Sequence, residues 1–429
     1  MLPGRPGQRK SWAGDDPGEQ IVSVPSAASL RAILTPAVLL RIGVGWVAFI
    51  ALLIAQPLQV GQMPSPVLFL VLAAIVAVIV VSSSGVVAQA ERLADRLGDP
   101  YGTLVLTLSI VLIEVILISA VMLGPGEHTT IARDSVMAST MIILTLVIGA
   151  ALLVGGLRHR DLRVNRTGVS SYLSLLVVLL ATAFALPAVM GTGGAYPAGL
   201  AIPVLTLTIL LYAFFLYRQT GAQSSDFKEV GATTSVSKGS ASKGAVSGGV
   251  ASSPAVAEPV TSAIPAQPRR TAGFSLHEHG TEVIVRSLVL LITAIPIVLL
   301  SHHMAVLLED GLGRLGAPVV LSGVLIAVIV LLPETITTIR AAWMGEGQRV
   351  TNLAHGALVS CVGLTLPVVL AIGLLTGQTV VLAERPVNLL LLAVSLLLSL
   401  TTFSAQRVTA LHGAAHLFVF VLYAISLFS

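Results

Sequence analysis

Charged residues are scarce in this sequence. Lys, Arg, Asp and Glu make up 10% of the 429 residues, whereas a soluble domain has about 25%, and hydrophobic residues make up 55%. This balance excludes a soluble globular protein and predicts a chain that crosses a lipid bilayer several times. The net charge of +4 would favour nucleic acid as a partner of a soluble chain. In a membrane chain the distribution of charge matters more than its total, and no nucleic-acid partner is expected.

Cysteine is nearly absent. Cys361 is the only one, which excludes an intramolecular disulfide and any cysteine-based zinc or iron-sulfur centre. It lies in a long apolar run, where we interpret it as a small apolar side chain. No cofactor is expected.

The chain has eleven apolar runs of about 20 residues, the length at which a helix spans the hydrocarbon core. Helices satisfy their own backbone polar groups in lipid, so the predicted fold class is all-α. The runs are 38–58, 67–88, 102–123, 136–156, 170–190, 198–217, 282–308, 317–340, 353–375, 385–403 and 409–428.

A segment rich in Gly, Ser, Ala and Pro, residues 221–270, divides these runs and has no helical stripe. The expected organisation has five parts. They are a disordered cytoplasmic arm (1–37), a first helix (38–58), a five-helix unit (65–217), a flexible cytoplasmic linker (218–280) and a second five-helix unit (282–428).

Lys and Arg are distributed unevenly between the segments that join the runs. The side that holds the N-terminus has nineteen and the opposite side has three; without the long arm and linker the counts are nine and three. Basic residues accumulate in cytoplasmic loops. The sequence therefore predicts a plasma-membrane protein with its N-terminus inside and its C-terminus outside.

A short motif occurs once in each five-helix unit. The stretches "ERLADRLGDP" at 91–100 and "EDGLGRLGAP" at 309–318 share Glu, Arg-Leu-Gly and Pro at an offset of 218 residues. Each copy lies between the first and second helix of its unit. Because each unit has an odd number of spans, the second unit is expected to be inverted, an arrangement typical of secondary transporters.

The second helix of each unit contains one carboxylate, Glu114 or Glu334, at an offset of 220. An ionised carboxylate costs several kcal/mol in hydrocarbon, and no Lys or Arg lies at equivalent depth in either helix. A proton or a metal cation must then neutralise the charge, and one divalent cation can replace two protons. The hydroxyls of Ser109 and Thr335, and carbonyls freed by Pro333, are candidate further ligands of an oxygen-preferring cation such as Ca²⁺.

Other ionisable residues are weaker candidates. Vestibule acids could attract cations at the two membrane faces or could make surface pairs with nearby arginines; they are Glu91, Asp95, Glu309 and Asp310. His412 and His416 are four residues apart, a spacing that can bind metal, but no third ligand is evident. We expect them to relay protons or to hydrogen-bond between helices.

Several stretches resemble the bacterial ChaA-type branch of the calcium/proton exchangers, within the calcium/cation antiporter superfamily. They include "ERLADRLGDPYGTLVLTLSIVLIEVILISAVM", "LLPETITTIRAA" and "VTNLAHGALVSCVGLTLPVV". The resemblance implies eleven helices, two inverted halves, and exchange of cytoplasmic Ca²⁺, or Na⁺ and K⁺, for external protons. It also implies that the two essential acids are Glu114 and Glu334. Where many exchangers have Gly-Asn before each acid, this chain has Ile-Val at 110–111 and Val-Leu at 330–331.

The leading hypothesis is a cation/proton antiporter, not an enzyme, whose partners are the bilayer, protons and the transported cations. A sodium-driven calcium exchanger is the alternative, and it should need further intramembrane carboxylates. An intramembrane enzyme would use Asp and a nucleophile motif, and a channel would need a polar pore. The sequence leaves the physiological cation and a homo-oligomeric state open.

Overall fold

The structure is a computed structural model that describes residues 33–55, 63–97, 108, 111–112, 114–116, 118–119, 122–123, 129–228, 276–317 and 320–428. These residues are almost all helical, and none of them forms an extended strand. The helices are α2 (Pro36–Ala55), α3 (Ser65–Leu97), α5 (Ile131–Met141), η2 (Ile142–Val147), α6 (Ile148–His159), α7 (Arg166–Leu180), η3 (Ala181–Ala185), α8 (Leu186–Met190), α9 (Ala198–Thr220), η4 (Ser224–Phe227), α11 (Leu276–Arg314), α12 (Val320–Met344), α13 (Gly347–Thr376), α14 (Pro386–Ser404) and α15 (Ala410–Ser426).

The predicted all-α membrane fold is confirmed. Eight helical segments among the described residues are long and apolar enough to cross a membrane, and α15 is a shorter apolar helix. The described residues of each predicted run except 102–123 lie almost entirely on one helix above or on consecutive helical segments. The described residues of run 102–123 from 108 to 122 are also helical. Most of the expected arm and of the expected linker lies outside the described residues. At the ends of the linker, α9 extends to Thr220 and α11 begins at Leu276.

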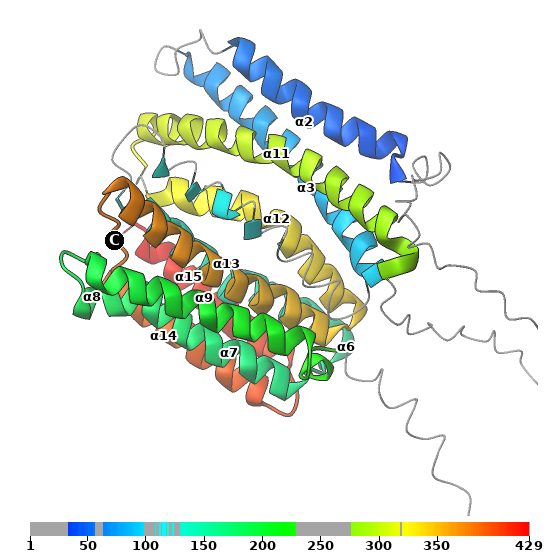
Figure 1. Ribbon diagram of the computed structural model, residues 1–429, viewed down its shortest axis with the longest axis vertical. Coiled ribbons are helices and arrows are strands. Elements are labelled where there is room, and N and C mark those ends of the chain that lie inside the picture. The colour runs from blue at the N-terminus through cyan, green and yellow to red at the C-terminus, as the bar shows by residue number, and fades with distance from the viewer. Residues whose placement is uncertain are drawn as a thin grey trace, which may run out of the picture.

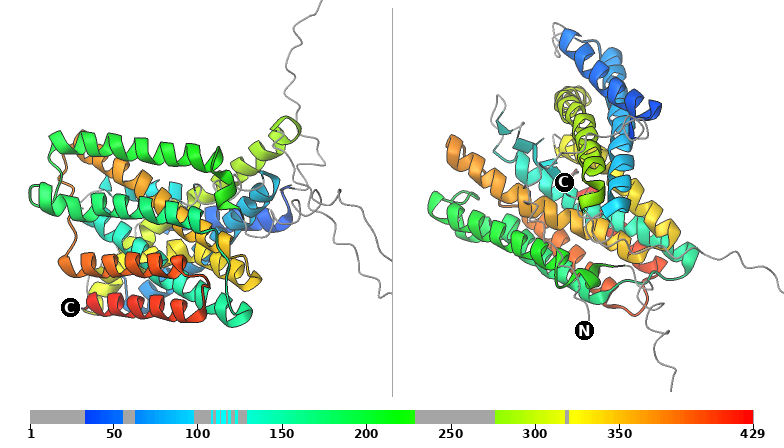
Figure 2. Two further views of the ribbon diagram at one scale, coloured as in Figure 1. Left: turned by 90° about the horizontal axis from the view of Figure 1, so that it is seen from below. Right: turned by 45° about the vertical axis from the view of Figure 1, so that its right-hand side comes forward.

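The helices form two groups (Figure 1). Helices α2, α3 and α11 lie on one side of the molecule, α6 to α9 and α13 to α15 lie on the other, and α12 lies between them. The right view of Figure 2 shows the same separation from a second direction. With 33 and 39 residues, α3 and α11 are about 50 and 58 Å long at 1.5 Å per residue, well beyond the ~30 Å hydrocarbon core.

Packing between the two units is reciprocal. Helix α6 packs on α15, the last helix of the other unit, and α13 packs on α9 in the same way. Both contacts depend on glycine. A Cβ at Gly413 would lie 2.4 Å from the backbone nitrogen of Leu153, and one at Gly363 would lie 2.9 Å from the ring of Tyr212. This reciprocity is the pattern that a structural repeat is expected to produce.

The loops pair in the same reciprocal manner. The α6–α7 loop meets the α14–α15 loop through a bridge between Leu162 and Val408. The α8–α9 loop meets the α13–α14 loop through a bridge between Ala195 and Val381. Each pair therefore joins one loop from each unit.

Candidate ion site

Glu114 is buried where three helical segments meet. Its side chain is 6% exposed, and the Ser139 hydroxyl, from α5, donates a hydrogen bond of 2.9 Å to its Oε1. The thiol of Cys361, from α13, lies against the same carboxyl group. One polar side chain from each five-helix unit thus contacts Glu114.

Glu334 lies on α12 and is also buried, at 7% exposed. Its charge interacts with that of Glu114, so the structure brings the two predicted acids together. The Oε1 atom of Glu334 is buried without a hydrogen-bond partner. A buried oxygen left in this state costs about 1–3 kcal/mol, which a bound cation, water or proton can recover.

The two glutamates have no basic neighbour among the residues that the structure describes. The ion pairs in that part of the chain all involve other acids: Asp134, Asp310, Glu346 and Glu384. Nor do these residues include a cluster of three or more His, Cys, Asp and Glu side chains. An ion held here would therefore take two carboxylates from the chain and find its other ligands among hydroxyls, carbonyls and water.

Both long helices beside this site are irregular at matching positions. The helix formed by α5 and α6 contains the π-helical segment η2, which ends at Val147. Helix α13 contains Pro367, which lies 220 residues after Val147. A π segment shifts the backbone hydrogen bonds, and an internal proline removes one, so each leaves carbonyl oxygens available. Pro333 is also expected to free backbone carbonyls, but α12 remains helical through this residue.

Comparison with known proteins places the chain in a family. The sequence pattern described as "Sodium/calcium exchanger protein" matches residues 67–221 and 286–429, which together are most of the chain. The chain belongs to this family. The resemblance that the sequence suggested is confirmed, and the exchanger is a secondary transporter rather than an enzyme.

Three relatives indicate how varied such exchangers are. The sodium-potassium/proton antiporter ChaA of Escherichia coli is 30% identical over 352 residues, which cover 81% of this chain and 86% of ChaA. The Ca²⁺/H⁺ antiporter protein YfkE has a TM-score of 0.60 at 17% identity and covers 91% of this chain and 98% of its own. The sodium-calcium exchanger NCX_Mj has a TM-score of 0.52 at 15% identity, covering 84% and 99%. The printed names of these three proteins give three different ion couplings. By its family and its similarity to ChaA, this chain is a cation/proton or a sodium/calcium exchanger.

The two candidate histidines of the exchanger have different environments. His416 is fully buried, and its Nδ1 donates to the carbonyl of Leu144, inside η2, over 2.7 Å. Its Nε2 lies 3.3 Å from the Thr402 hydroxyl. His412 instead takes part in the N-terminal cap of α15 with Thr409. His416 therefore holds a carbonyl of the irregular helix, whereas His412 stabilises a helix end.

The remaining predicted residues bond to other groups, lie at the surface or are outside the described part. Thr335 follows Glu334 in α12, but its hydroxyl donates to the carbonyl of Leu331 in the same helix over 2.8 Å. Asp310 pairs with Arg314 at 2.7 Å on the surface, and Glu309 is exposed. Ser109 and the side chains of Glu91 and Asp95 lie outside what the structure describes.

The sequence reasoning did not single out Ser139 or Thr365, and it treated Cys361 as an ordinary apolar residue. A signal for this region was present in the chain. The tripeptide Leu-Thr-Leu occurs at 106–108, 144–146, 205–207 and 364–366. Of these copies, 144–146 and 364–366 have the same 220-residue offset as the glutamates, so the offset, rather than the tripeptide, pairs the two helices that lie beside the acids.

A narrow cavity is lined by residues of α5, η3, α13 and the α13–α14 loop. Its lining includes Thr365, one turn after Cys361, and Arg133. Arg133 is bound to Asp134 at 2.7 Å and to Glu384 at 3.5 Å, and it donates to the carbonyl of Ala383. These contacts tie α5 to the α13–α14 loop across the mouth of the cavity.

Proposed function

We propose that the exchanger exports Ca²⁺, Na⁺ or K⁺ from the cytoplasm in exchange for H⁺, with Glu114 and Glu334 as the shared binding site. The observation that carries this proposal is the pair of buried, mutually interacting carboxyls without a basic neighbour among the described residues. Two such groups cannot both stay ionised and empty in a low-dielectric site. Their charge has to be balanced by ions that come and go.

The coupling follows from this charge balance. When a divalent cation leaves, two protons can take its place, so the net charge of the site stays the same. The empty site carries two uncompensated charges, and moving it through the hydrocarbon would cost far more than moving either loaded form. The protein should therefore change its facing direction only when it holds a cation or protons, which prevents uncoupled leak of either ion.

Individual oxygens have distinct roles in this proposal. The unpartnered Oε1 of Glu334 is the first ligand open to an incoming cation or proton. Ser139 holds the Glu114 carboxyl in a fixed orientation, and its own oxygen can serve as a further ligand. Carbonyls near η2 and Pro367 can complete an oxygen shell of the kind that Ca²⁺ accepts.

Reorientation would use the repeat. The reciprocal packing of α6 on α15 and of α13 on α9 supports two inverted five-helix units that rock about the glutamate pair. The excess of Lys and Arg near the α6–α7 and α14–α15 loops supports a plasma-membrane orientation with these loops in the cytoplasm.

Sodium-driven calcium exchange is the second candidate, because the fold is similar to that of NCX_Mj. Exchange of several Na⁺ for one Ca²⁺ calls for more than two carboxylates near the site. In the described part of the chain, the next buried acid is Glu384, which binds Arg133 near one end. The two-carboxylate site therefore favours protons as the counter-ion.

The deciding experiment uses everted membrane vesicles with a respiration-generated ΔpH. Ca²⁺, Na⁺ and K⁺ are added in turn to wild type, Glu114→Gln and Glu334→Gln, and collapse of ΔpH is recorded. We expect one cation or more to collapse ΔpH in wild type and none in either variant. Glu384→Gln is the matched control, since it removes a buried carboxylate outside the site and should keep the response.

Two results would overturn the proposal. If no cation releases protons while a Na⁺ gradient drives Ca²⁺ uptake at zero ΔpH, the exchanger is sodium-driven. If both glutamine variants respond like wild type, the glutamates are structural and the ion site lies elsewhere.

A further inference from the structure

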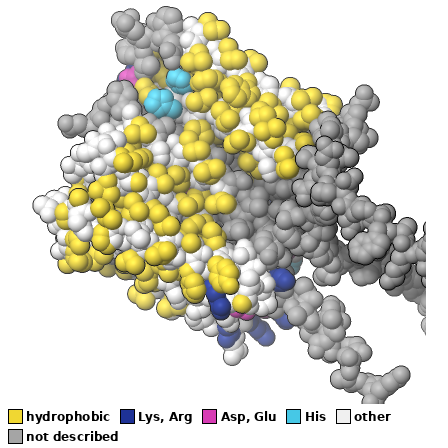
Figure 3. All heavy atoms as spheres, viewed as in Figure 1, with side chains coloured by type: hydrophobic (Ala, Val, Ile, Leu, Met, Phe, Trp, Pro, Cys, Tyr) yellow, Lys and Arg dark blue, Asp and Glu magenta, His cyan; other side chains and the backbone are white. Residues whose placement is uncertain are grey.

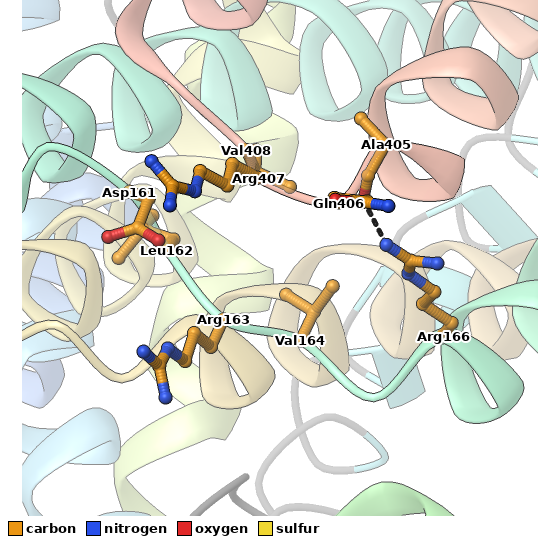
Figure 4. A pocket seen from close by; sticks show the side chains of 9 residues that line it. All are labelled: Asp161, Leu162, Arg163, Val164, Arg166, Ala405, Gln406, Arg407 and Val408. Carbon is orange, nitrogen blue, oxygen red and sulfur yellow. Dashed lines mark hydrogen bonds between the residues drawn. The ribbon is translucent and has the colours of Figure 1, made fainter.

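A pocket lies away from the glutamate site, where the α6–α7 and α14–α15 loops meet (Figure 4). It has a volume of about 310 Å³, and its lining includes Arg163, Arg166, Arg407 and Asp161. This volume is large enough for several water molecules or for a phosphate with an attached glycerol. Nothing in the exchange mechanism requires such a pocket.

The floor of the pocket is built into the fold. The backbone nitrogen of Leu162 donates to the carbonyl of Val408 over 3.0 Å, and both side chains are buried. A Cβ at Gly156 would lie 2.3 Å from the backbone nitrogen of Ala410, so the close packing of α6 on the start of α15 requires glycine at this position. The two loops therefore keep a fixed spacing.

The arginines of the pocket have unused hydrogen-bonding capacity. In the described part of the chain, the guanidinium groups of Arg163 and Arg407 make no ion pair or hydrogen bond, and both side chains are exposed. Arg166 uses one nitrogen, Nη2, to donate to the Ala405 carbonyl over 3.0 Å. Since a guanidinium has five N–H donors in a planar fork, all three can still bind oxyanions.

The charge of the pocket is positive even after its acid is counted. Three arginines and Asp161 give a formal charge of +2 for the lining. Helices α6 and α14 end at these loops, and α7 and α15 begin there, so their dipoles largely offset one another. The arginine side chains decide the sign of the site.

The pocket also lies at the level of lipid head groups. Trp343, near the end of α12, is 54% exposed, and the Arg158 guanidinium lies 4.1 Å from its ring centroid. The His159 ring lies 2.9 Å from the Trp343 carbonyl, which ties this tryptophan to the residue just before the α6–α7 loop. Exposed tryptophans mark the interface between hydrocarbon and water. Figure 3 shows Lys and Arg side chains gathered at one end of a surface that is otherwise largely hydrophobic.

We infer that this pocket binds a phosphate group, supplied by an anionic phospholipid of the adjacent leaflet. Basic pockets between membrane helices on the cytoplasmic side suit anionic head groups, because the leaflet there is negatively charged. Arg163 and Arg407 bind the phosphate oxygens, Arg166 holds the α14 end of the pocket, and Asp161 limits the affinity. The head group would join a loop of the first unit to a loop of the second.

The test measures binding to the purified full-length chain, stripped of lipid in a nonionic detergent. Dioctanoyl phosphatidylglycerol is titrated in one arm, dioctanoyl phosphatidylcholine in a second and inorganic phosphate in a third, with native mass spectrometry and thermal melting as readouts. We expect the anionic lipid to bind and to raise the melting temperature, and the zwitterionic lipid of equal chain length to do neither.

Matched variants separate the pocket from general surface charge. Each arginine removed should weaken binding about fivefold, so the double variant Arg163→Gln with Arg407→Gln should lose about 25-fold. Arg160→Gln removes an equal charge from the same loop outside the lining and should change binding less than twofold. Asp161→Asn should tighten binding, since it removes the only acid of the lining.

Each outcome is decisive. Inorganic phosphate that binds and competes with the lipid would keep the phosphate site and name the free anion as its ligand. The inference is overturned if neither the lipid nor phosphate binds. It is also overturned if the double variant and Arg160→Gln weaken binding equally. Transport is not a readout, so failure of the proposed ion exchange would not affect this result.

Discussion

Glu114 and Glu334 lie 220 residues apart, at matching places in the two predicted five-helix units, yet their surroundings differ. Both are almost completely buried, at 6% and 7% exposed. Glu114 accepts a hydrogen bond from Ser139 and contacts Cys361, whereas one oxygen of Glu334 has no partner. The two acids thus have equivalent positions in the sequence, but the side chains that contact them are not equivalent.

The 220-residue offset gives a reason for this asymmetry. The position equivalent to Ser139 is Val359, and the position equivalent to Cys361 is Met141. Both polar neighbours of Glu114 are thus replaced by side chains without a strong donor. In the proposed ion site, the Glu114 carboxyl would be held in place by Ser139, and the Glu334 carboxyl would be free to bind the transported ion.

Removing the donor to Glu114 should produce the largest change in this comparison. In Ser139→Ala the Glu114 carboxylate loses a hydrogen bond to a charged group, a contribution of about 1.5–3 kcal/mol. We expect the cation concentration that collapses half of ΔpH in everted vesicles to rise about tenfold or more. Thr140→Val is the matched control, because the neighbouring Thr140 hydroxyl bonds the Val136 carbonyl of its own helix. If both variants raise this cation concentration equally, the Ser139 hydroxyl has no specific role in ion binding.

Stability offers a second way to separate the two acids. Each of Glu114→Met and Glu334→Met relieves the same repulsion between the pair, so the difference between them reports the local contacts alone. Glu334→Met should be more stable by roughly 1–3 kcal/mol, since it removes an unpartnered oxygen and Glu114→Met leaves the Ser139 hydroxyl unpaired.

This difference can be measured through the only cysteine. Cys361 is 1% exposed, so a thiol-reactive dye should report unfolding in detergent, with chelator present to keep cations away. Equal melting temperatures for the two variants would show that Glu334 is as well satisfied as Glu114.

Hydropathy was enough to predict the helical membrane fold and to single out two acids that the structure buries. The membrane spans follow from runs of apolar residues, and Glu114 and Glu334 stand out because a charge in such a run is costly. The role of Ser139 could not be predicted in the same way, because it depends on how α5 is rotated toward a separate helix. A hydroxyl in an apolar helix usually bonds its own backbone, as Thr335 does.

Long-range loop pairing was equally hidden from the sequence. Leu162 and Val408 are 246 residues apart, and no local pattern links their loops. In the sequence, the arginines of these two loops indicate only which side of the membrane the loops face. In the structure, Arg163, Arg166 and Arg407 line one pocket. The π segment η2 has no distinctive composition, and only its match with Pro367 at the 220-residue offset marks it.

The smallest expected effect comes from restoring the missing hydroxyl. Val359→Thr keeps the shape of a side chain that is 0% exposed and adds a donor at the position equivalent to Ser139. If the repeat places it beside Glu334 as Ser139 lies beside Glu114, a net contribution of about 1 kcal/mol should tighten cation binding about fivefold. The concentration of cation that collapses half of ΔpH should fall accordingly.

A matched control separates this gain from the cost of burying a hydroxyl. Val350→Thr adds the same group at a 1% exposed position near the start of α13 and should leave cation affinity unchanged. Weaker cation binding in Val359→Thr would mean that the added hydroxyl bonds its own helix or competes for the site. In that case the two carboxyls differ because their helices are rotated differently, and the single exchange of Ser139 for Val359 is not the cause.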